Sequence, residues 1–239
     1  MLSFNFGGKN SFDDFGIIIA KRPSLPSPKR RVSYIDIPGR DSNLRYDEGT
    51  YEDITITVEC TVKGENIMTQ LDSIKSWLFS AGESSLIFSF QPDKKYKAQV
   101  VNAIDFKQAY KIASQFVIVF NCRPFKSAVS NVPIIITIGT GITVVNQGTV
   151  QSRPIIKVYC TGNGSIKING RDVLLSGIDT TYIILDSELE EAYSYKNGML
   201  VNLNNSVTGE FPILDVGDNI ITYIGGVTKL EITPNWRWL

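Results

Sequence analysis

The sequence predicts a mainly β protein in which a single helix belongs to the first of two domains. Three observations support this. Apolar and polar residues alternate strictly from Ile54 to Val62, residues 65–83 show helical spacing, and short β-branched segments separated by turn residues fill the chain after residue 128. The 239 residues suit one large domain or two small ones. We expect a β-rich domain over residues 1–128 and an antiparallel β-sandwich over residues 129–239.

The strands of the first domain follow from their residue types. The segment from Ile54 to Val62 has the period of two that is typical of a half-buried strand. One of its faces carries isoleucine, valine and cysteine, and the other carries threonine and glutamate. Residues 84–90 (SSLIFSF) and 114–122 (SQFVIVFNC) are rich in β-branched and aromatic residues, so we expect two further strands there.

The predicted helix lies in the segment ENIMTQLDSIKSWLFSAGE. Its apolar residues recur at helical spacing, namely Ile67, Leu71, Ile74 and Leu78. Trp77 widens this apolar stripe, and Gly82 can end the helix in a left-handed conformation. We expect the helix to pack on one face of the sheet as part of the core.

A basic, proline-rich segment precedes the carboxylate-rich part of the chain. Lys21–Arg31 (KRPSLPSPKRR) contains three prolines and five basic residues. One interpretation is a nucleic-acid or localisation patch; the other is an extended, solvated arm with polyproline character. The flanks lack the interleaved aromatic residues that single-strand binders use, which favours the arm.

The second domain begins after a segment that ends the strand pattern of the first, residues 121–133 (NCRPFKSAVSNVP). Short β-runs follow, and three residue pairs supply the positive φ angles of tight hairpin turns: Asn169-Gly170, Asn197-Gly198 and Gly225-Gly226. Strands punctuated this often predict an antiparallel sandwich.

The last run keeps one apolar face up to the end of the chain. The residues of this face are Leu230, Ile232, Pro234, Trp236 and Trp238. Chain ends usually fray. Two tryptophans on a continued apolar face therefore predict that this end is docked, either against its own sheet or against the first domain.

Composition excludes several classes of function. The chain has no histidine, which removes the commonest general base, Ser-His-Asp and Cys-His triads, and zinc sites that use histidine. Cys60, Cys122 and Cys160 lie far apart, so we interpret them as buried hydrophobic residues of a protein made in a reducing cytoplasm. Residues 1–128 hold 17 Lys/Arg against 14 Asp/Glu and residues 129–239 hold 7 against 10, an imbalance too weak to predict nucleic-acid binding.

Targeting signals are not evident in the sequence. The N-terminus (MLSFNFGGKN) lacks a charged start followed by an apolar core, so we expect no secretion signal. The longest apolar stretch, residues 133–145, is interrupted by Gly139 and Gly141 and is too short to span a bilayer. We expect a soluble protein made in the cytosol.

Two acidic clusters are the candidates for chemistry. The first comprises Asp41, Asp47, Glu48, Glu52 and Asp53. A glycosidase needs two carboxylates about 5 to 9 Å apart across a cleft, one with a raised pKa. These residues instead crowd around Gly49 beside Arg40 and Arg45, which favours a solvated loop or a subunit contact. The second cluster, in residues 186–195 (DSELEEAYSY), lacks the spacing of a calcium loop and is predicted to be a turn.

Four segments, in chain order, carry a recognisable pattern. They are PGRDSNLRYDEGTYEDITITVEC (38–60), NQGTVQSRPIIKVYCTGNGSIKING (146–170), IILDSELEEAYSYKNGMLVNLNNSVTGEFPILDVGDNIITY (183–223) and ITPNWRWL (232–239). Together they resemble the distal tail proteins of siphophages, bacteriophages with long, non-contractile tails. They span nearly the whole chain.

The resemblance implies a fold, an assembly and a location. Residues 1–128 would assemble into a hexameric ring that continues the tail tube, and residues 129–239 would form a galectin-like sandwich outside the ring. The ring would be a hub at the distal tail tip, or baseplate, of the virion. Its partners would be the tail-tube protein, the tape-measure protein, the tail-associated baseplate protein and the receptor-binding protein. DNA would only pass through the lumen, and neither membrane binding nor catalysis is implied.

Two alternatives belong to other classes of function. The sandwich domain holds seven aromatic residues suited to stacking on sugars, so carbohydrate binding in host adhesion is the main alternative: Tyr159, Tyr182, Tyr193, Tyr195, Tyr223, Trp236 and Trp238. Aromatic residues of a sandwich are more often core or interface, and we expect no independent sugar site. The other alternative, a cell-wall hydrolase, lacks a nucleophile or a metal site in the sequence. We therefore expect no enzyme, and no catalytic, cofactor-binding or metal-binding residues.

Overall fold

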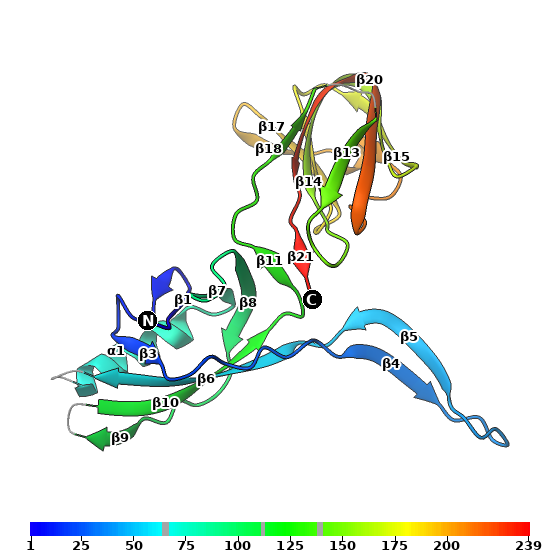
Figure 1. Cartoon of the computed structure of the whole chain (residues 1–239). Coiled ribbons are helices and arrows are strands. Elements are labelled where there is room, and N and C mark those ends of the chain that lie inside the picture. Colours follow the sequence, from blue (N-terminus) through cyan, green and yellow to red (C-terminus); the bar gives the residue numbers. More distant parts are fainter. Residues whose placement is uncertain (64–66, 111–112, 138–140) are drawn as a thin grey trace. The chain divides into compact units, whose positions relative to one another are not determined.

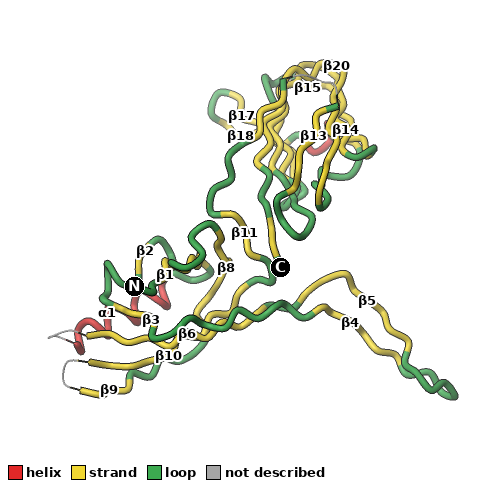
Figure 2. Tube along the Cα trace, viewed as in Figure 1, coloured by secondary structure: helices red, strands yellow, loops and turns green. Residues whose placement is uncertain are grey.

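The computed structural model describes residues 1–63, 67–110, 113–137 and 141–239. The chain forms two compact units, an N-terminal unit of Met1–Val129 with Leu239 and a C-terminal unit of Ser130–Trp238. Strands dominate both units, and the one α-helix of the described residues lies in the first (Figures 1 and 2). The mainly β fold class with one helix is therefore confirmed.

The N-terminal unit is built on an antiparallel sheet with the strand order β2-β1-β7-β8-β10-β6-β3. The strands are β1 (Phe4–Phe6), β2 (Lys9–Asn10), β3 (Ile17–Ile19), β6 (Ile54–Lys63), β7 (Ser84–Phe88), β8 (Lys94–Val100) and β10 (Ala113–Cys122), with β9 (Lys107–Tyr110) on β10 and β11 (Lys126–Ala128) on β8. β6 and β10 pair over ten residues without a register shift. The alternation predicted for β6 is confirmed, since every second side chain from Ile54 to Val62 is buried.

The predicted helix is α1 (Ile67–Ser80), and it covers one face of this sheet with the five apolar side chains that the spacing indicated. Trp77 is central to the packing: its ring stacks on Phe15 with centroids 4.3 Å apart, and its indole N–H donates to the carbonyl oxygen of Phe6 at 3.0 Å. Gly82 has a φ of 56° and follows the helix as expected. The first two residues of the predicted segment lie outside the described residues.

The basic and acidic segments fold onto each other as a hairpin of β4 (Arg30–Ile35) and β5 (Leu44–Tyr51) (Figure 1). Two predictions are therefore wrong in part. The solvated arm ends at Lys29, because Arg30 and Arg31 begin a strand. The acidic segment is largely a strand rather than a loop; Gly49, at a φ of 69°, lies where the pairing register shifts. A glycine in this conformation is typical of a β-bulge.

The C-terminal unit consists of two layers that share two long strands, β14 (Ile155–Ile168) and β20 (Gly217–Thr233). The first layer has the order β12-β20-β14-β16-β17-β18 and the second β13-β20-β14-β15-β19. The remaining strands are β12 (Ile134–Ile136), β13 (Ile142–Asn146), β15 (Arg171–Ile178), β16 (Ile183–Asp186), β17 (Glu191–Lys196), β18 (Met199–Asn202), β19 (Val207–Thr208) and β21 (Arg237–Trp238), with a 3-10 turn η1 (Asn204–Ser206). The core lies between the layers.

The glycine pairs of this unit have two different roles. Asn169-Gly170 and Asn197-Gly198 have positive φ angles and close the β14–β15 and β17–β18 hairpins, as predicted. Gly225-Gly226 forms no hairpin turn, so that prediction is wrong: the pair lies inside β20, where the register with β14 shifts. A Cβ atom at Gly226 would clash with the carbonyl oxygen of Thr161. The pair therefore allows the two long strands to approach closely as they pass between the layers.

The C-terminal end is docked, which confirms the prediction from its two tryptophans. Pro234 and Trp236 are buried and Trp238 is half-buried. The Arg237 side chain donates to the carbonyl oxygen of Gln151 at 2.8 Å. These contacts tie the segment to its own unit.

Candidate interaction surfaces

Two carboxylates of the first acidic cluster, Asp47 and Glu52, form surface ion pairs. The Arg30 guanidinium lies 2.8 Å from a carboxylate oxygen of Asp47, and Lys29 lies 3.4 Å from Glu52. The pKa of Asp47 is held below its usual range, mainly by a hydrogen bond from the Gly49 backbone N–H and also by the hydrogen bond and charge of the Arg30 side chain. Glu48 accepts a hydrogen bond from the Ser33 hydroxyl at 2.8 Å. Carboxylates that form solvent-exposed ion pairs stay ionised, so they are suited to holding a hairpin together rather than to proton transfer.

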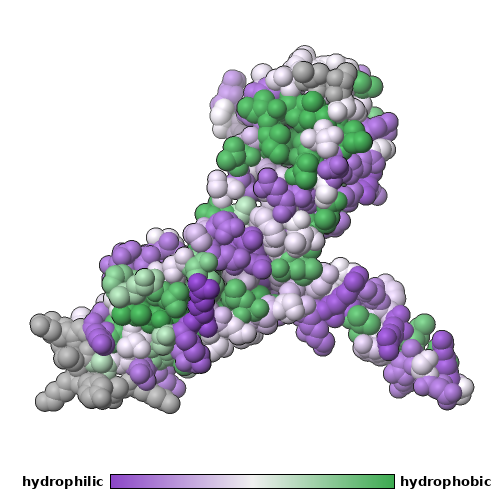
Figure 3. Space-filling model, in the orientation of Figure 1, coloured by the Kyte–Doolittle hydropathy of each residue, from purple (hydrophilic) through white to green (hydrophobic). Residues whose placement is uncertain are grey.

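One face of this hairpin carries an apolar strip made of Ile35, Leu44 and Tyr46. Ile35 lies directly opposite Leu44, and Tyr46 follows on the same face because side chains two residues apart share a face. These side chains are 45–62% exposed. The opposite face carries Tyr34, which is 61% exposed and has the Arg45 guanidinium 5.9 Å from its ring centroid. Figure 3 shows hydrophobic residues interrupting the hydrophilic surface of the hairpin.

The second acidic cluster contains the turn between β16 and β17 at residues 187–190, as predicted, whereas residues 191–195 belong to β17. Asp186 is buried, and its Oδ1 accepts the backbone N–H groups of Glu188 at 3.0 Å and Leu189 at 3.1 Å. Within residues 1–63, 67–110, 113–137 and 141–239, no group of three or more acidic or cysteine side chains is placed to hold a metal ion.

The three cysteine thiols are buried, which matches their interpretation as hydrophobic residues. Burial raises the pKa of Cys60 to about 12 and, together with the nearby Asp53 carboxylate, the pKa of Cys122 to about 12. Burial also raises the pKa of Cys160. Because the thiolate is the nucleophilic form, these side chains are poor nucleophiles at neutral pH.

Four of the seven aromatic residues considered for sugar binding lie on the outer face of the first layer: Tyr159, Tyr182, Tyr193 and Tyr195. The Lys157 ammonium lies 4.1 Å from the ring centroid of Tyr182, and the Lys229 ammonium lies 4.7 Å from that of Tyr159. A stacked sugar would compete with these cation–π contacts. The others are Tyr223 and Trp236, which are buried, and Trp238, which is half-buried. This arrangement favours packing over sugar recognition.

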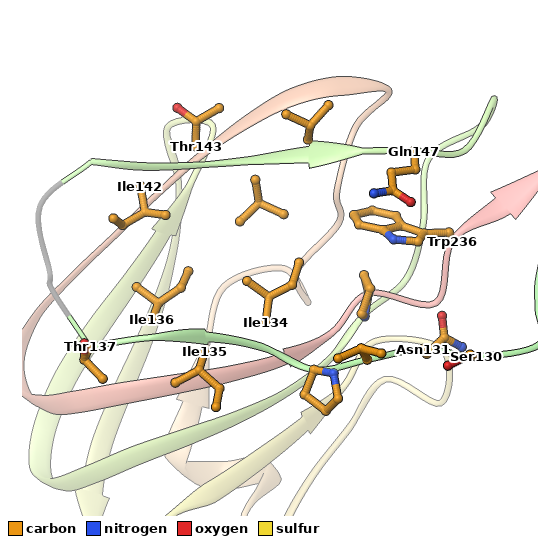
Figure 4. A pocket seen from close by; sticks show the side chains of 15 residues that line it. Ser130, Asn131, Ile134, Ile135, Ile136, Thr137, Ile142, Thr143, Gln147 and Trp236 are labelled. Carbon is orange, nitrogen blue, oxygen red and sulfur yellow. The ribbon is translucent and has the colours of Figure 1, made fainter.

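An apolar groove of about 700 Å³ lies between β12 and β13 of the C-terminal unit (Figure 4). Its walls include Ile134 and Ile136 from β12, Ile142 and Val144 from β13, and Trp236 at one end. Hydrophobic residues also gather on the face of the unit where β13 lies (Figure 3). The volume is within the usual range of ligand pockets, roughly 300–1,000 Å³.

Sequence reasoning missed both apolar surfaces. The hairpin strip had a local signal, since Tyr34, Ile35 and Ile37 lie close together shortly after the basic arm, with only Asp36 between them. Most of the groove wall comes from the longest apolar stretch, residues 133–145, but that stretch did not indicate a groove. The groove arises from the pairing of β12 and β13 with two parts of β20 that lie about 70 to 100 residues further along the chain.

Comparison with known proteins shows two similarities. Residues 10–122 match the family model of the phage tail protein RIFT-related domain. The whole chain is similar in structure to the Dit (gp 19.1) protein of SPP1, described as a paradigm of hub adsorption apparatus in phages that infect Gram-positive hosts. The TM-score is 0.78, the identity 13%, and the match covers 100% of both chains. A search of curated proteins gave no match. Among the described residues, no helix is long and apolar enough to cross a membrane.

Proposed function

We propose that this chain is a structural hub at the distal end of a siphophage tail, because residues 10–122 match the family model of the phage tail protein RIFT-related domain. In addition, the whole chain has the fold of a phage hub protein. In this role it joins the tail tube and the end of the tape-measure protein to the tail-associated baseplate protein and the receptor-binding proteins. The full-length match in fold carries this proposal.

The proposed assembly is a ring of six copies with DNA passing through its lumen. The number six comes from the resemblance to distal tail proteins. A closed ring needs two different patches of one subunit to meet around a rotation axis. The β4–β5 hairpin supplies one such patch, because its apolar strip is exposed and the hairpin pairs with no other strand among the described residues. Because these three side chains are only about half exposed, burying each of them on a neighbour would contribute about 1 kcal/mol.

Two substitutions on opposite faces of the hairpin test this assembly. Tyr46→Asp places a charge in the apolar strip, whereas Tyr34→Asp places the same charge on the other face at nearly equal exposure. Gel filtration coupled to light scattering should give a mass near six times 26.6 kDa for the unchanged protein. The Tyr46→Asp variant should dissociate, because a carboxylate buried at an interface is strongly unfavourable, and the Tyr34→Asp variant should keep the ring.

A monomeric mass for the unchanged protein would contradict ring formation in isolation. Equal dissociation of both variants would show that the strip has no special role. Far-ultraviolet circular dichroism of each variant serves as the control for folding.

We also propose that the protein has no enzymatic role. Three observations support this: Asp47 and Glu52 are held in surface ion pairs, the thiols are buried, and the sequence has no histidine. Loss of turbidity of a cell-wall suspension on adding the purified protein would contradict it. Similarly, binding to a glycan array that is abolished by Tyr182→Ala would establish the carbohydrate-binding alternative.

A further inference from the structure

The groove between β12 and β13 lies where both layers of the C-terminal unit end. β12 pairs with residues 230–232 of β20, and β13 pairs with residues 217–221. β14 occupies the opposite edge of β20, so β12 and β13 are the edge strands of their layers on the same side. Among the described residues, neither strand pairs with a further strand at its outer edge. The groove is therefore flanked by two backbone edges with free hydrogen-bonding groups.

The chemistry of the groove is apolar and uncharged. Its fifteen lining residues include no Asp, Glu, Lys or Arg. The rim carries Val132, Ile135 and Val145, which are 55–73% exposed. A contiguous exposed apolar surface beside a free strand edge is a liability unless something covers it.

One polar atom in the groove lacks a partner. The side-chain oxygen Oδ1 of Asn131 is buried and has no hydrogen-bond donor. Asn131 lies at the same end of the groove as Trp236 (Figure 4). A buried acceptor without a donor is costly, about 1–3 kcal/mol. A ligand that brings an N–H group to this end would satisfy it, and every peptide unit of an extended strand except proline has one.

We propose that this groove binds an extended, uncharged strand of another tail component, which pairs with the free edge of β13 and places alternate apolar side chains between the two layers. β13 is favoured over β12 because it has five residues rather than three, and because Pro133, directly before β12, has no N–H to donate. Strand addition of this kind takes its affinity from backbone hydrogen bonds and its specificity from alternate side chains. That the partner is a tail component rests on the proposed function.

The test uses the full chain and a defined probe, the uncharged peptide acetyl-TVTVTVT-amide. Binding is followed by NMR of isoleucine methyl groups, with Ile134, Ile136 and Ile142 as reporters inside the groove. We expect their signals to shift on titration. The peptide acetyl-TVTPTVT-amide, which loses a central N–H, should bind at least about tenfold more weakly because a ladder hydrogen bond is lost.

Matched variants locate the binding. Ile142→Asp places a charge on the groove wall. Ile220→Asp places the same charge on β20, next to Ile221, the residue that pairs with Ile142. The Ile220 side chain is 55% exposed and lies outside the groove. Ile142→Asp should weaken binding by about tenfold or more, because a carboxylate in an apolar groove is poorly solvated, and Ile220→Asp should leave it unchanged. Should Ile142→Asp fail to fold, Val145→Asp on the rim replaces it.

Three results would overturn the proposal. The first is the absence of methyl shifts in the groove, and the second is equal peptide affinity of the Ile142→Asp (or Val145→Asp) and Ile220→Asp variants. The third is a lower particle mass of the Ile142→Asp variant in the absence of peptide, which would identify a second copy of the chain as the occupant. The outcome is separable from that of the ring, since peptide binding is measured at the groove and the ring is tested by Tyr46→Asp.

Discussion

Gly226 occupies a position at which the fold cannot accommodate any side chain. A Cβ atom there would clash with the Thr161 carbonyl oxygen, whereas a Cβ at Gly198 would meet nothing within 4 Å. Gly226→Ala should therefore lower the free energy of unfolding by roughly 3 kcal/mol or more, because the backbone of β14 must move. Gly198→Ala should cost only about 1–2 kcal/mol, the strain of its positive φ.

Urea denaturation followed by circular dichroism measures both glycine variants. Similar losses of stability in the two would contradict the close approach of β14 and β20. Because both glycines lie in the same unit, the difference between the two losses of stability separates the cost of the Cβ clash at position 226 from the cost of the positive φ at position 198.

At the scale of elements, α1 holds the N-terminal core through Trp77. The ring is buried against Phe15 and Phe4, and its N–H satisfies the carbonyl oxygen of Phe6. Trp77→Ala should cost about 3–5 kcal/mol, because it leaves a cavity and an unpaired carbonyl group. Phe79→Ala, at an exposed position of the same helix, should change the free energy of unfolding by less than about 0.5 kcal/mol.

Thermal unfolding monitored by circular dichroism checks the helix. A loss for Trp77→Ala that is no larger than the loss for Phe79→Ala would show that α1 is not anchored through its indole. The helix itself was predictable from the sequence, because its apolar spacing is local. Its apolar side chains share one core with those of β6, whose period of two is equally clear.

At the scale of the whole molecule, each unit buries its own set of apolar side chains. We expect two transitions in scanning calorimetry, since each unit has the core that independent cooperative unfolding requires. Trp77→Ala should lower the midpoint of one transition and Gly226→Ala that of the other. A single transition shifted by both substitutions would mean that the chain unfolds as one cooperative body.

The local patterns of the sequence determined the mainly β class, the helix, β6 and β10, the Asn-Gly hairpins and the docked C-terminal end. Each of these depends on neighbours within a few residues or on a strict period. The Gly225-Gly226 prediction failed because a glycine pair permits both a tight turn and a close strand crossing, and only β14, some sixty residues earlier in the chain, decides between them. The same holds for the acidic segment, which became a strand because Arg30–Ile35 pairs with it.

Tertiary structure alone decided which apolar side chains remain exposed. Isoleucines such as Ile35, Ile156 and Ile142 are equivalent in a sequence, yet Ile35 lies on an exposed hairpin, Ile156 is buried in the core and Ile142 lines an open groove. The physical reason is that burial depends on which strand edges are already paired, and pairing across a hundred residues of chain leaves no periodic signal in either partner. The sequence thus identified the kind of protein, and the fold located the surfaces through which it can act.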